Sequence, residues 1–279
     1  MEPQLRVIGQ NDLSAEATVL AGTYQLGEPQ AEYKIGLKKW MVTYIWMGII
    51  GAIIGIVLAV LGLMGMASDD SAWQLAVVGV ACFFGCLYLI ARYARYPLVR
   101  RSWKVVVCAK GFIFTKNGQA EAFAWDQIES VWQEIKVYKK YGTTTGTTYK
   151  YTVRRKDGVQ VLIDDTFEDN DVLGQKIVEE AHNVQLPLAI EAFHAGQTLH
   201  FGPLSISAQG LSNGKELLPW DGTIRRINIS NGYFEVKKTD KLLLWANIEV
   251  SKIPNVLVLH NLIRYITSPS PEAEQVDAK

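Results

Sequence analysis

The stretch MVTYIWMGIIGAIIGIVLAVLGLMGM (residues 41–66) decides the fold class, because no charged side chain interrupts it. A second uncharged stretch, WQLAVVGVACFFGCLYLIA (residues 73–91), follows after the short turn ASDDSA. An α-helix rises about 1.5 Å per residue, so each stretch is long enough to cross a hydrocarbon core of about 30 Å. The sequence therefore predicts a two-helix transmembrane hairpin within residues 40–92, with helices at about 41–66 and 73–91.

Charges around the predicted hairpin indicate its orientation. The turn contains Asp69 and Asp70 and no basic residue. Both outer ends are basic, with Lys34, Lys38 and Lys39 before the first helix and Arg92, Arg95, Arg100, Arg101 and Lys104 after the second. Basic residues favour the cytoplasmic side, and the first stretch is too long and too far along the chain for a signal peptide. We therefore expect an integral protein of the bacterial inner (cell) membrane, with two spans and both termini in the cytoplasm.

Small residues recur along both predicted helices at three- and four-residue spacing. The candidates for close helix packing are Gly51, Gly55, Ala59, Gly79 and Gly85. Such residues let helix backbones approach closely in lipid, within the hairpin or between copies of a homo-oligomer, although glycine is also common in transmembrane helices generally. Neither stretch contains Asp, Glu, Lys, Arg or His, which transporters and proton pumps usually place inside the membrane. We expect the hairpin to be an anchor.

Charge and cysteine content argue against a nucleic-acid-binding protein, a disulfide-stabilised protein and a zinc protein. The 279 residues carry 28 basic and 28 acidic side chains, so no net field attracts nucleic acid, and no nucleic-acid partner is expected. The three cysteines, Cys82, Cys86 and Cys108, form neither a disulfide framework nor a zinc signature. This usage fits a reducing, cytosolic setting for the polar part of the chain.

Beyond Arg101 the pattern changes to short β-branched runs separated by turn residues. The pair Asn117-Gly118 is typical of a tight β-hairpin turn. The runs continue to Asp164, and apolar residues at helical spacing follow over residues 167–182. This order predicts a first domain over residues 100–185, in which an antiparallel strand meander is closed by one helix.

A second copy of the same pattern follows. LSISAQG (204–210) resembles VVVCAKG (105–111), and each copy continues to a Trp-Asp pair, Trp125-Asp126 in the first and Trp220-Asp221 in the second. A pattern of this length that occurs only twice indicates two copies of one domain rather than a solenoid. The second domain is predicted over residues 199–267.

The remaining segments are predicted to connect or flank these parts. Pro187 limits how far the helix before it can continue, which leaves residues 186–198 as a linker. Residues 1–39 form an N-terminal cytoplasmic segment that is partly flexible, and residues 268–279 form a disordered tail.

The strand meander with its glycine turn, the Trp-Asp segment before the fourth strand and the closing helix resemble the bacterial pleckstrin-homology-like (PH-like) fold. Residues 40–267 resemble uncharacterised bacterial membrane proteins that join a two-helix hairpin to PH-like domains. The resemblance implies an α+β membrane protein with a transmembrane hairpin followed by two tandem PH-like domains, each an antiparallel β-meander or barrel with a C-terminal helix. It implies no catalytic residues. The second copy is short in its middle, which leaves open whether its barrel has all seven strands.

No catalytic or metal-binding constellation stands out. His194 and His200 are close in sequence but have no evident third ligand. The carboxylates between Asp164 and Asp171 could serve acid–base chemistry, but at a predicted helix start they are better explained as caps and dipole partners. The chain has no nucleophile elbow, P-loop or dinucleotide fingerprint. We expect no cofactor, no metal and no enzymatic activity, with an unrecognised site at these acids as the remaining enzyme hypothesis.

Basic side chains on two adjacent predicted strands are the candidate contact for anionic lipid headgroups. They are Lys136, Lys139, Lys140, Lys150, Arg154, Arg155 and Lys156. A basic residue near an anionic membrane surface contributes about 1 kcal/mol of attraction. The alternative is an ordinary solvated strand face, on which lysines prevent edge-to-edge pairing.

These features together predict a membrane-anchored, non-enzymatic protein. Its tandem PH-like domains would be presented in the cytoplasm for binding a protein partner or for assembly as a homo-oligomer. An anionic-lipid-responsive membrane sensor is the alternative hypothesis.

Overall fold

The computed structural model describes residues 13–35, 39–65, 71–100, 102–221, 223–239 and 243–267. The tail predicted at 268–279 and the first part of the predicted N-terminal segment lie outside the described residues. The chain divides into two compact units, an apolar unit (34–104 and 115–120) and a β-rich unit (the described residues within 1–33, 105–114 and 121–279).

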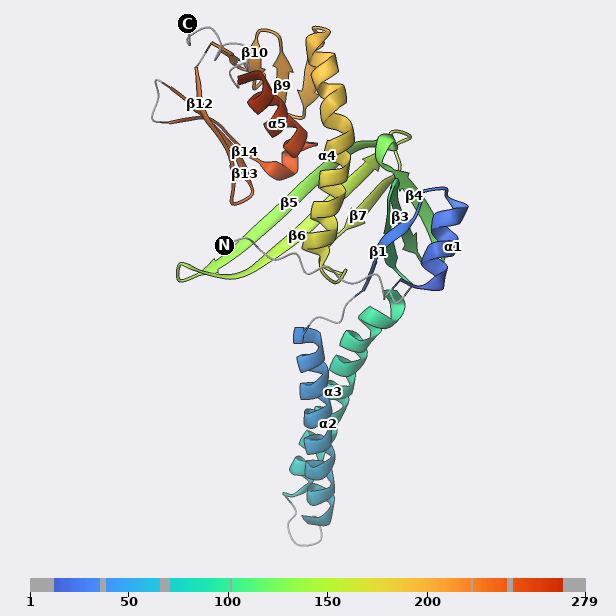
Figure 1. The fold of residues 1–279 in the computed structure, drawn as a ribbon. Helices are drawn as coiled ribbons and strands as arrows, with labels where there is room; N and C mark the ends of the chain where they lie inside the picture. The colour runs from blue at the N-terminus through green and yellow to red at the C-terminus, as the bar shows by residue number, and fades with distance from the viewer. Residues whose placement is uncertain are drawn as a thin grey trace, which may run out of the picture. The chain divides into compact units, whose positions relative to one another are not determined.

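The apolar unit is built on two long helices, α2 (Lys39–Gly65) and α3 (Trp73–Arg100), which pack side by side (Figure 1). Among the described residues, Met41–Gly65 and Trp73–Arg95 are long and apolar enough to cross a membrane, with mean hydropathies of 2.7 and 2.2. Helix α3 continues nine residues past the predicted end at 91. The arginines after that point end the uncharged stretch, but arginine and alanine are good helix formers, so the helix continues.

The β-rich unit begins with a helix and a strand from the segment before the hairpin. Helix α1 (Ala15–Thr23) is capped by Ser14, whose Oγ accepts a hydrogen bond from the Ala17 amide at 3.2 Å. Strand β1 (Pro29–Lys34) then joins the edge of a four-stranded sheet of order β1-β2-β3-β4. The hairpin is therefore inserted between the first two strands of this sheet. The other strands are β2 (Lys104–Cys108), β3 (Gly111–Lys116) and β4 (Gln119–Ala124).

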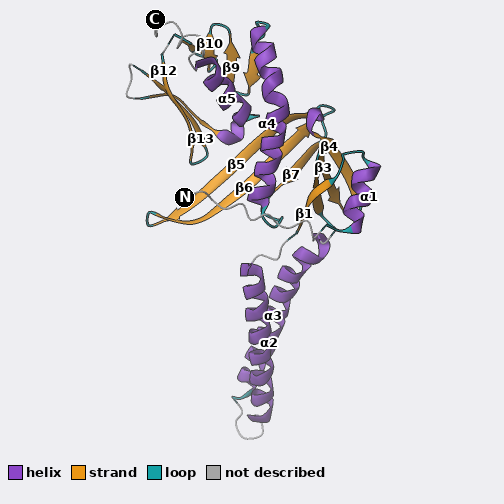
Figure 2. Ribbon diagram, viewed as in Figure 1, coloured by secondary structure: helices purple, strands orange, loops and turns teal. Residues whose placement is uncertain are grey.

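A second, three-stranded sheet of order β5-β6-β7 follows a single 3-10 turn at Trp125–Gln127. Its strands are β5 (Ile128–Lys140), β6 (Thr143–Arg155) and β7 (Gln160–Ile163). Antiparallel pairing joins β5 to β6 from Ile128↔Arg155 out to Lys140↔Thr143. The result is a long, narrow hairpin (Figure 2). With helix α4 (Asn170–His194), strands β1 to β7 form the first repeat.

The linker predicted at 186–198 is largely helix in the structure, because α4 continues through Pro187 to His194. Proline lacks an N–H, which removes one backbone hydrogen bond from the helix interior. Burial of the following turns offsets that loss: Ala189 belongs to the core of the C-terminal strands, and Leu186, Ile190 and Phe193 pack against it. The earlier turns bury Leu173, Gly174, Ile177, Val178 and Ala181. One helix thus serves both halves of the β-rich unit.

The second repeat has the same order of elements in shorter form. A four-stranded sheet of order β11-β10-β9-β8 is followed by a three-stranded sheet of order β12-β13-β14 and a closing helix, α5 (Val256–Thr267). Among the described residues of this copy, seven strands are therefore present despite its short middle. They are β8 (Leu199–Phe201), β9 (Leu204–Ser207), β10 (Gly210–Ser212), β11 (Leu217–Pro219), β12 (Ile224–Ser230), β13 (Tyr233–Lys238) and β14 (Leu244–Glu249).

The sequence repeat corresponds to equivalent contacts in the two repeats. A Cβ on Gly111 would lie 2.3 Å from the Phe123 carbonyl oxygen, and one on Gly210 would lie 2.2 Å from that of Leu218. Each of these carbonyls is two residues before the tryptophan of its repeat. The indoles of Trp125 and Trp220 in turn donate to carbonyls two or three residues before that glycine, those of Ala109 (3.3 Å) and Ser207 (2.9 Å). Both motifs therefore fix close packing between strands.

Candidate functional site at the edge of strand β5

The two repeats meet at the edge of β5, and Asn255 makes most of the polar contact. Its amide donates to the Val131 carbonyl at 2.9 Å, and its side-chain Oδ1 accepts from the Val131 amide at 2.8 Å. Its Nδ2 also donates to the Glu129 carbonyl at 2.9 Å. Asn255 has a φ of +52°, a conformation that asparagine tolerates better than most residues. A single residue before α5 thus continues the hydrogen bonding of the β5 edge.

Two further contacts lie beside this edge, one within the first repeat and one between the repeats. Gln185 of α4 donates to the Ile128 carbonyl at 2.9 Å, at the beginning of β5. Between the helices, the Asn261 amide group lies 2.8 Å from His182 Nε2. Figure 1 shows α4 and α5 adjacent to one another beside β5. The first half of the β5 edge is therefore covered by Asn255 of the second repeat and by Gln185 of α4.

The second half of the β5 edge is open. Backbone groups along a strand point alternately to the two sides, and Val131 points outward to Asn255, so Ile135 and Val137 also point outward. The outward N–H and C=O groups of Val137 have no protein partner among the described residues. The β12–β13 turn passes close by, because a Cβ on Gly232 would lie 2.7 Å from the Ile135 carbonyl oxygen.

A groove of about 480 Å³ lies between this open edge and the turn of the second repeat. We call it the edge groove, and it is lined by Glu134, Ile135, Lys136, Val137, Tyr138, Asn231, Gly232, Tyr233, Glu249 and Ser251. Polar and apolar surfaces both contribute, and the two tyrosines are 53% (Tyr138) and 39% (Tyr233) exposed. Unpaired strand groups beside a groove with aromatic walls can accept an extended peptide as an added strand.

The seven basic side chains named as lipid-contact candidates differ in their surroundings, because four of them have acidic partners. Glu134 lies 2.5 Å from Lys136 and 3.4 Å from Lys150. The hydrogen bond from Lys136 is the main reason that the pKa of Glu134 is lowered, and it raises the pKa of Lys136.

The arginines of this set have structural contacts. Arg154 pairs with Glu129 at 2.7 Å and lies 5.1 Å from the centre of the Trp132 ring. Arg155 donates to Asp157 and to the Ala122 carbonyl, and only 17% of its side chain is exposed. Its hydrogen bond to Asp157 lowers the pKa of that carboxyl group. Arg155 thereby ties β6 to β4 and is not available to a ligand.

The other three basic residues of the set, Lys139, Lys140 and Lys156, form no ion pair within the part of the chain that the structure describes. Lys139 and Lys140 lie at the end of the β5–β6 hairpin, where both are exposed. Lys156 lies at the opposite end of β6, after Arg155. The structure therefore separates the unpaired charge into a pair at the hairpin end and one distant residue.

The acidic stretch from Asp164 to Asp171 forms a turn and a helix start. Asp164 Oδ1 accepts from the Thr166 amide at 3.0 Å, and α4 begins at Asn170, with Asp169 as its N-cap residue but without a side-chain capping bond. Among the described residues, no group of three or more His, Cys, Asp or Glu side chains could hold a metal ion.

The small residues of the hairpin are placed mostly in the contact between α2 and α3. A Cβ on Gly51 would lie 2.6 Å from Cys86 Sγ, one on Gly55 would lie 2.8 Å from the Gly79 carbonyl oxygen, and one on Gly79 would lie 2.3 Å from the Ala59 amide nitrogen. Gly85 is outside this contact, since a Cβ there would meet nothing within 4 Å. The helix turns it away from α2.

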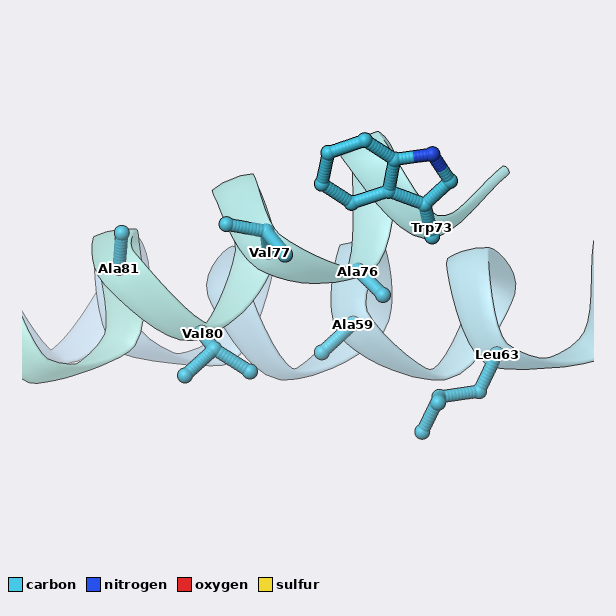
Figure 3. Close-up of a pocket in the computed structure, with 7 residues that line it drawn as sticks. All are labelled: Ala59, Leu63, Trp73, Ala76, Val77, Val80 and Ala81. Atoms are coloured by element: carbon cyan, nitrogen blue, oxygen red, sulfur yellow. The ribbon is translucent and has the colours of Figure 1, made fainter. Parts of the chain in front are cut away.

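An apolar hollow of about 440 Å³ lies on the surface of the same hairpin (Figure 3). Alanines form much of its lining, with valines and two larger side chains around them: Ala59, Leu63, Trp73, Ala76, Val77, Val80 and Ala81. No charged side chain lines it. Its apolar side chains match those exposed along the rest of α2 and α3, a surface that is suited to lipid.

Sequence reasoning missed Asn255 and Gly232 as site residues. Asn231-Gly232 has the same turn signal as Asn117-Gly118, so the β12–β13 turn could have been identified from the sequence. Asn255 gave no local signal, because its partners on β5 are more than a hundred residues away in the sequence.

Comparison with known proteins gives a family and no function. No curated protein and no solved structure matches the chain. A model of the DUF6585 family, described as a family of unknown function, matches residues 14–272, which include both repeats and the hairpin between β1 and β2. The chain therefore belongs to the DUF6585 family.

Proposed function

We propose that this chain is a membrane-anchored, non-enzymatic protein that binds an extended segment of a protein partner in its edge groove. Helices α2 and α3 would anchor it in the bacterial inner membrane with both termini in the cytoplasm. In each repeat, a four-stranded and a three-stranded antiparallel sheet followed by a helix support assignment as tandem PH-like domains.

The observation that carries the proposal is the half-covered edge of β5. Exposed edge strands are a hazard in solution, and proteins usually cover them. Here Asn255 and Gln185 cover the first half, while the outward groups of Val137 face a groove. A partner strand could pair with Val137 and place side chains against Tyr138 and Tyr233, since backbone pairing supplies affinity and side-chain pockets supply specificity.

Site-specific photo-crosslinking in native membranes tests this binding. The full chain would carry benzoylphenylalanine in place of Tyr233, and ultraviolet light should give an adduct with one protein. Val137→Pro removes only an outward N–H, because proline is tolerated at such edge positions and the ladder to β6 does not use that group. We expect this variant to lose at least about tenfold of the adduct, the size of effect that roughly 1.4 kcal/mol of lost binding produces.

The matched control is Val137→Thr, which keeps the N–H and should keep the adduct. An adduct that is equally strong in the proline variant would contradict pairing at this edge. An adduct with the mass of two copies would identify a homo-oligomer as the partner. Alkaline carbonate extraction of the same membranes tests the anchor, and release of the chain into the supernatant would contradict it.

A further inference from the structure

We propose that the end of the β5–β6 hairpin, residues Tyr138–Thr147, contacts anionic phospholipid headgroups of the membrane in which the chain is anchored. We call these residues the hairpin tip. The inference rests on the proposed membrane anchor but not on partner binding in the edge groove. Three independent features of the tip support it.

The first feature is unpaired positive charge. From Ile135 to Lys156 the sequence contains seven basic residues and no acidic one. Glu134, Glu129 and Asp157, which all lie outside this segment, pair with four of the basic residues toward the base of the hairpin. Lys139 and Lys140 remain without a carboxylate partner among the described residues, so the tip carries two adjacent unpaired positive charges.

The second feature is an exposed aromatic ring beside these lysines. Tyr141 is 96% exposed, and the Nζ atom of Lys140 lies 5.7 Å from the centre of its ring. Tyr138 at the base of the tip is 53% exposed. Tyrosine has an apolar ring and a polar hydroxyl, which suits the headgroup region of a bilayer, and lysine next to it suits an anionic surface.

The third feature is the backbone conformation of Tyr141. The turn has φ values of +51° at Tyr141 and +81° at Gly142. Two other tight turns have almost the same pair of angles, +52° and +82° at Asn117-Gly118 and +50° and +80° at Asn231-Gly232. Asparagine is the residue that favours this position, whereas a bulky side chain there is strained. An unfavourable tyrosine whose side chain is exposed indicates a role for that side chain.

Strand pairing reaches these groups, with an irregularity in the register between Tyr138 and Lys139. Pairing continues to Lys140↔Thr143, directly next to the turn, and the Thr145 hydroxyl donates to the Tyr138 carbonyl at 3.2 Å. The lysines and Tyr141 are therefore presented together by an ordered strand pair, and their contact with headgroups requires little further ordering of the chain.

Photo-crosslinking to lipid tests the proposal with the full chain reconstituted in liposomes. Benzoylphenylalanine replaces Thr144, which pairs with Lys139, and lipid adducts are measured by mass spectrometry. We expect the yield in liposomes with one-third phosphatidylglycerol to exceed that in pure phosphatidylcholine by at least about fivefold, and to fall at high salt. The double variant Lys139→Gln/Lys140→Gln should remove this excess, and Tyr141→Asn should lower the yield in both lipids.

The matched control changes two other exposed lysines, Lys156→Gln/Lys215→Gln, and should leave the yield unchanged. Equal yields in the two lipids, no loss in the Lys139→Gln/Lys140→Gln variant, or adducts with protein instead of lipid would each overturn the proposal. Carbonate extraction of the liposomes separates this result from failure of the anchor. A chain that resists extraction yet gives no lipid adduct contradicts the tip contact alone.

Discussion

The first and second repeats bury equivalent glycine and tryptophan contacts, but their central hairpins differ. Strands β5 and β6 have 13 residues each, whereas β12 and β13 have seven and six. The short hairpin ends in Asn231-Gly232 and lies against β5, while the long one ends in Tyr141-Gly142 and is exposed. Two copies of one fold have therefore kept the same core and diverged at the hairpin. The glycine and tryptophan contacts that the repeats share stabilise the fold, and the central hairpins in which they differ provide the candidate binding surfaces.

The shared core gives the largest expected effect. Gly111→Val and Gly210→Val each place a side chain within van der Waals distance of a strand carbonyl that cannot move far. We expect each to lower the free energy of unfolding by about 4 kcal/mol or more, as for severe overpacking. Chemical denaturation of the full chain in detergent measures this. Gly146→Val, where a Cβ meets nothing within 4 Å, is the control. Tolerance of valine at one glycine but not the other would break the equivalence of the repeats.

The contact between the repeats should give the next largest effect. Asn255→Ala removes two side-chain hydrogen bonds to β5 and leaves the Val131 amide without its partner. We expect a loss of about 2–3 kcal/mol of unfolding free energy, and a denaturation curve that separates into two transitions. Asn255→Gly keeps the φ of +52° accessible, so a similar loss in both variants assigns the effect to the side chain. A single unchanged transition would show that the repeats are coupled elsewhere.

Replacing Tyr141 by the residue found at the equivalent turns should stabilise the protein. Tyr141→Asn relieves an unfavourable φ of +51° and is expected to raise the free energy of unfolding by about 1 kcal/mol. Asn231→Tyr, the reverse change in the short hairpin, should destabilise it by a similar amount. Thermal unfolding of the two variants measures both effects. Destabilisation by Tyr141→Asn would indicate that the ring packs within the protein instead of serving the surface.

Acid should weaken the long hairpin slightly. The pKa of Glu134 is lowered by hydrogen bonds from Lys136 and Lys150. Its stabilising contribution is thus present above the unfolded-state pKa, near 4.5, and is lost as the pH falls through the lower folded-state value. Hydrogen exchange of β5 amides should be slower in the wild type than in Glu134→Gln at pH 6, and the difference should shrink as the pH falls below about 4.5. A difference that does not shrink with acid would contradict this ion pair.

Much of the fold was accessible from the sequence because it is encoded locally. Two uncharged stretches gave the apolar hairpin, and the Gly and Trp-Asp motifs gave the repeat. Strand β1 was not predicted, because Pro29–Lys34 is polar and buries only Tyr33. The continuation of α4 past Pro187 was not predicted either, since the core that stabilises its last turns comes from later in the chain.

The candidate site was less accessible than the fold. The edge groove combines residues near 135 with residues near 232 and 250, and no local pattern relates them. The basic residues of the long hairpin were visible in the sequence, but which of them are neutralised depends on strand pairing. Glu134 reaches Lys150 because the two residues face each other in the β5–β6 register.

The most direct test of the central claim is the ratio of crosslinked adduct in Val137→Pro to that in Val137→Thr, with the probe at position 233 in native membranes. The threonine variant keeps the outward N–H of residue 137 on the β5 edge, and the proline variant lacks it. Binding of an extended partner segment at β5 predicts a ratio of about one-tenth or less, with unchanged unfolding of the two proteins. A ratio near one would contradict the claim that the open edge of β5 is the binding surface.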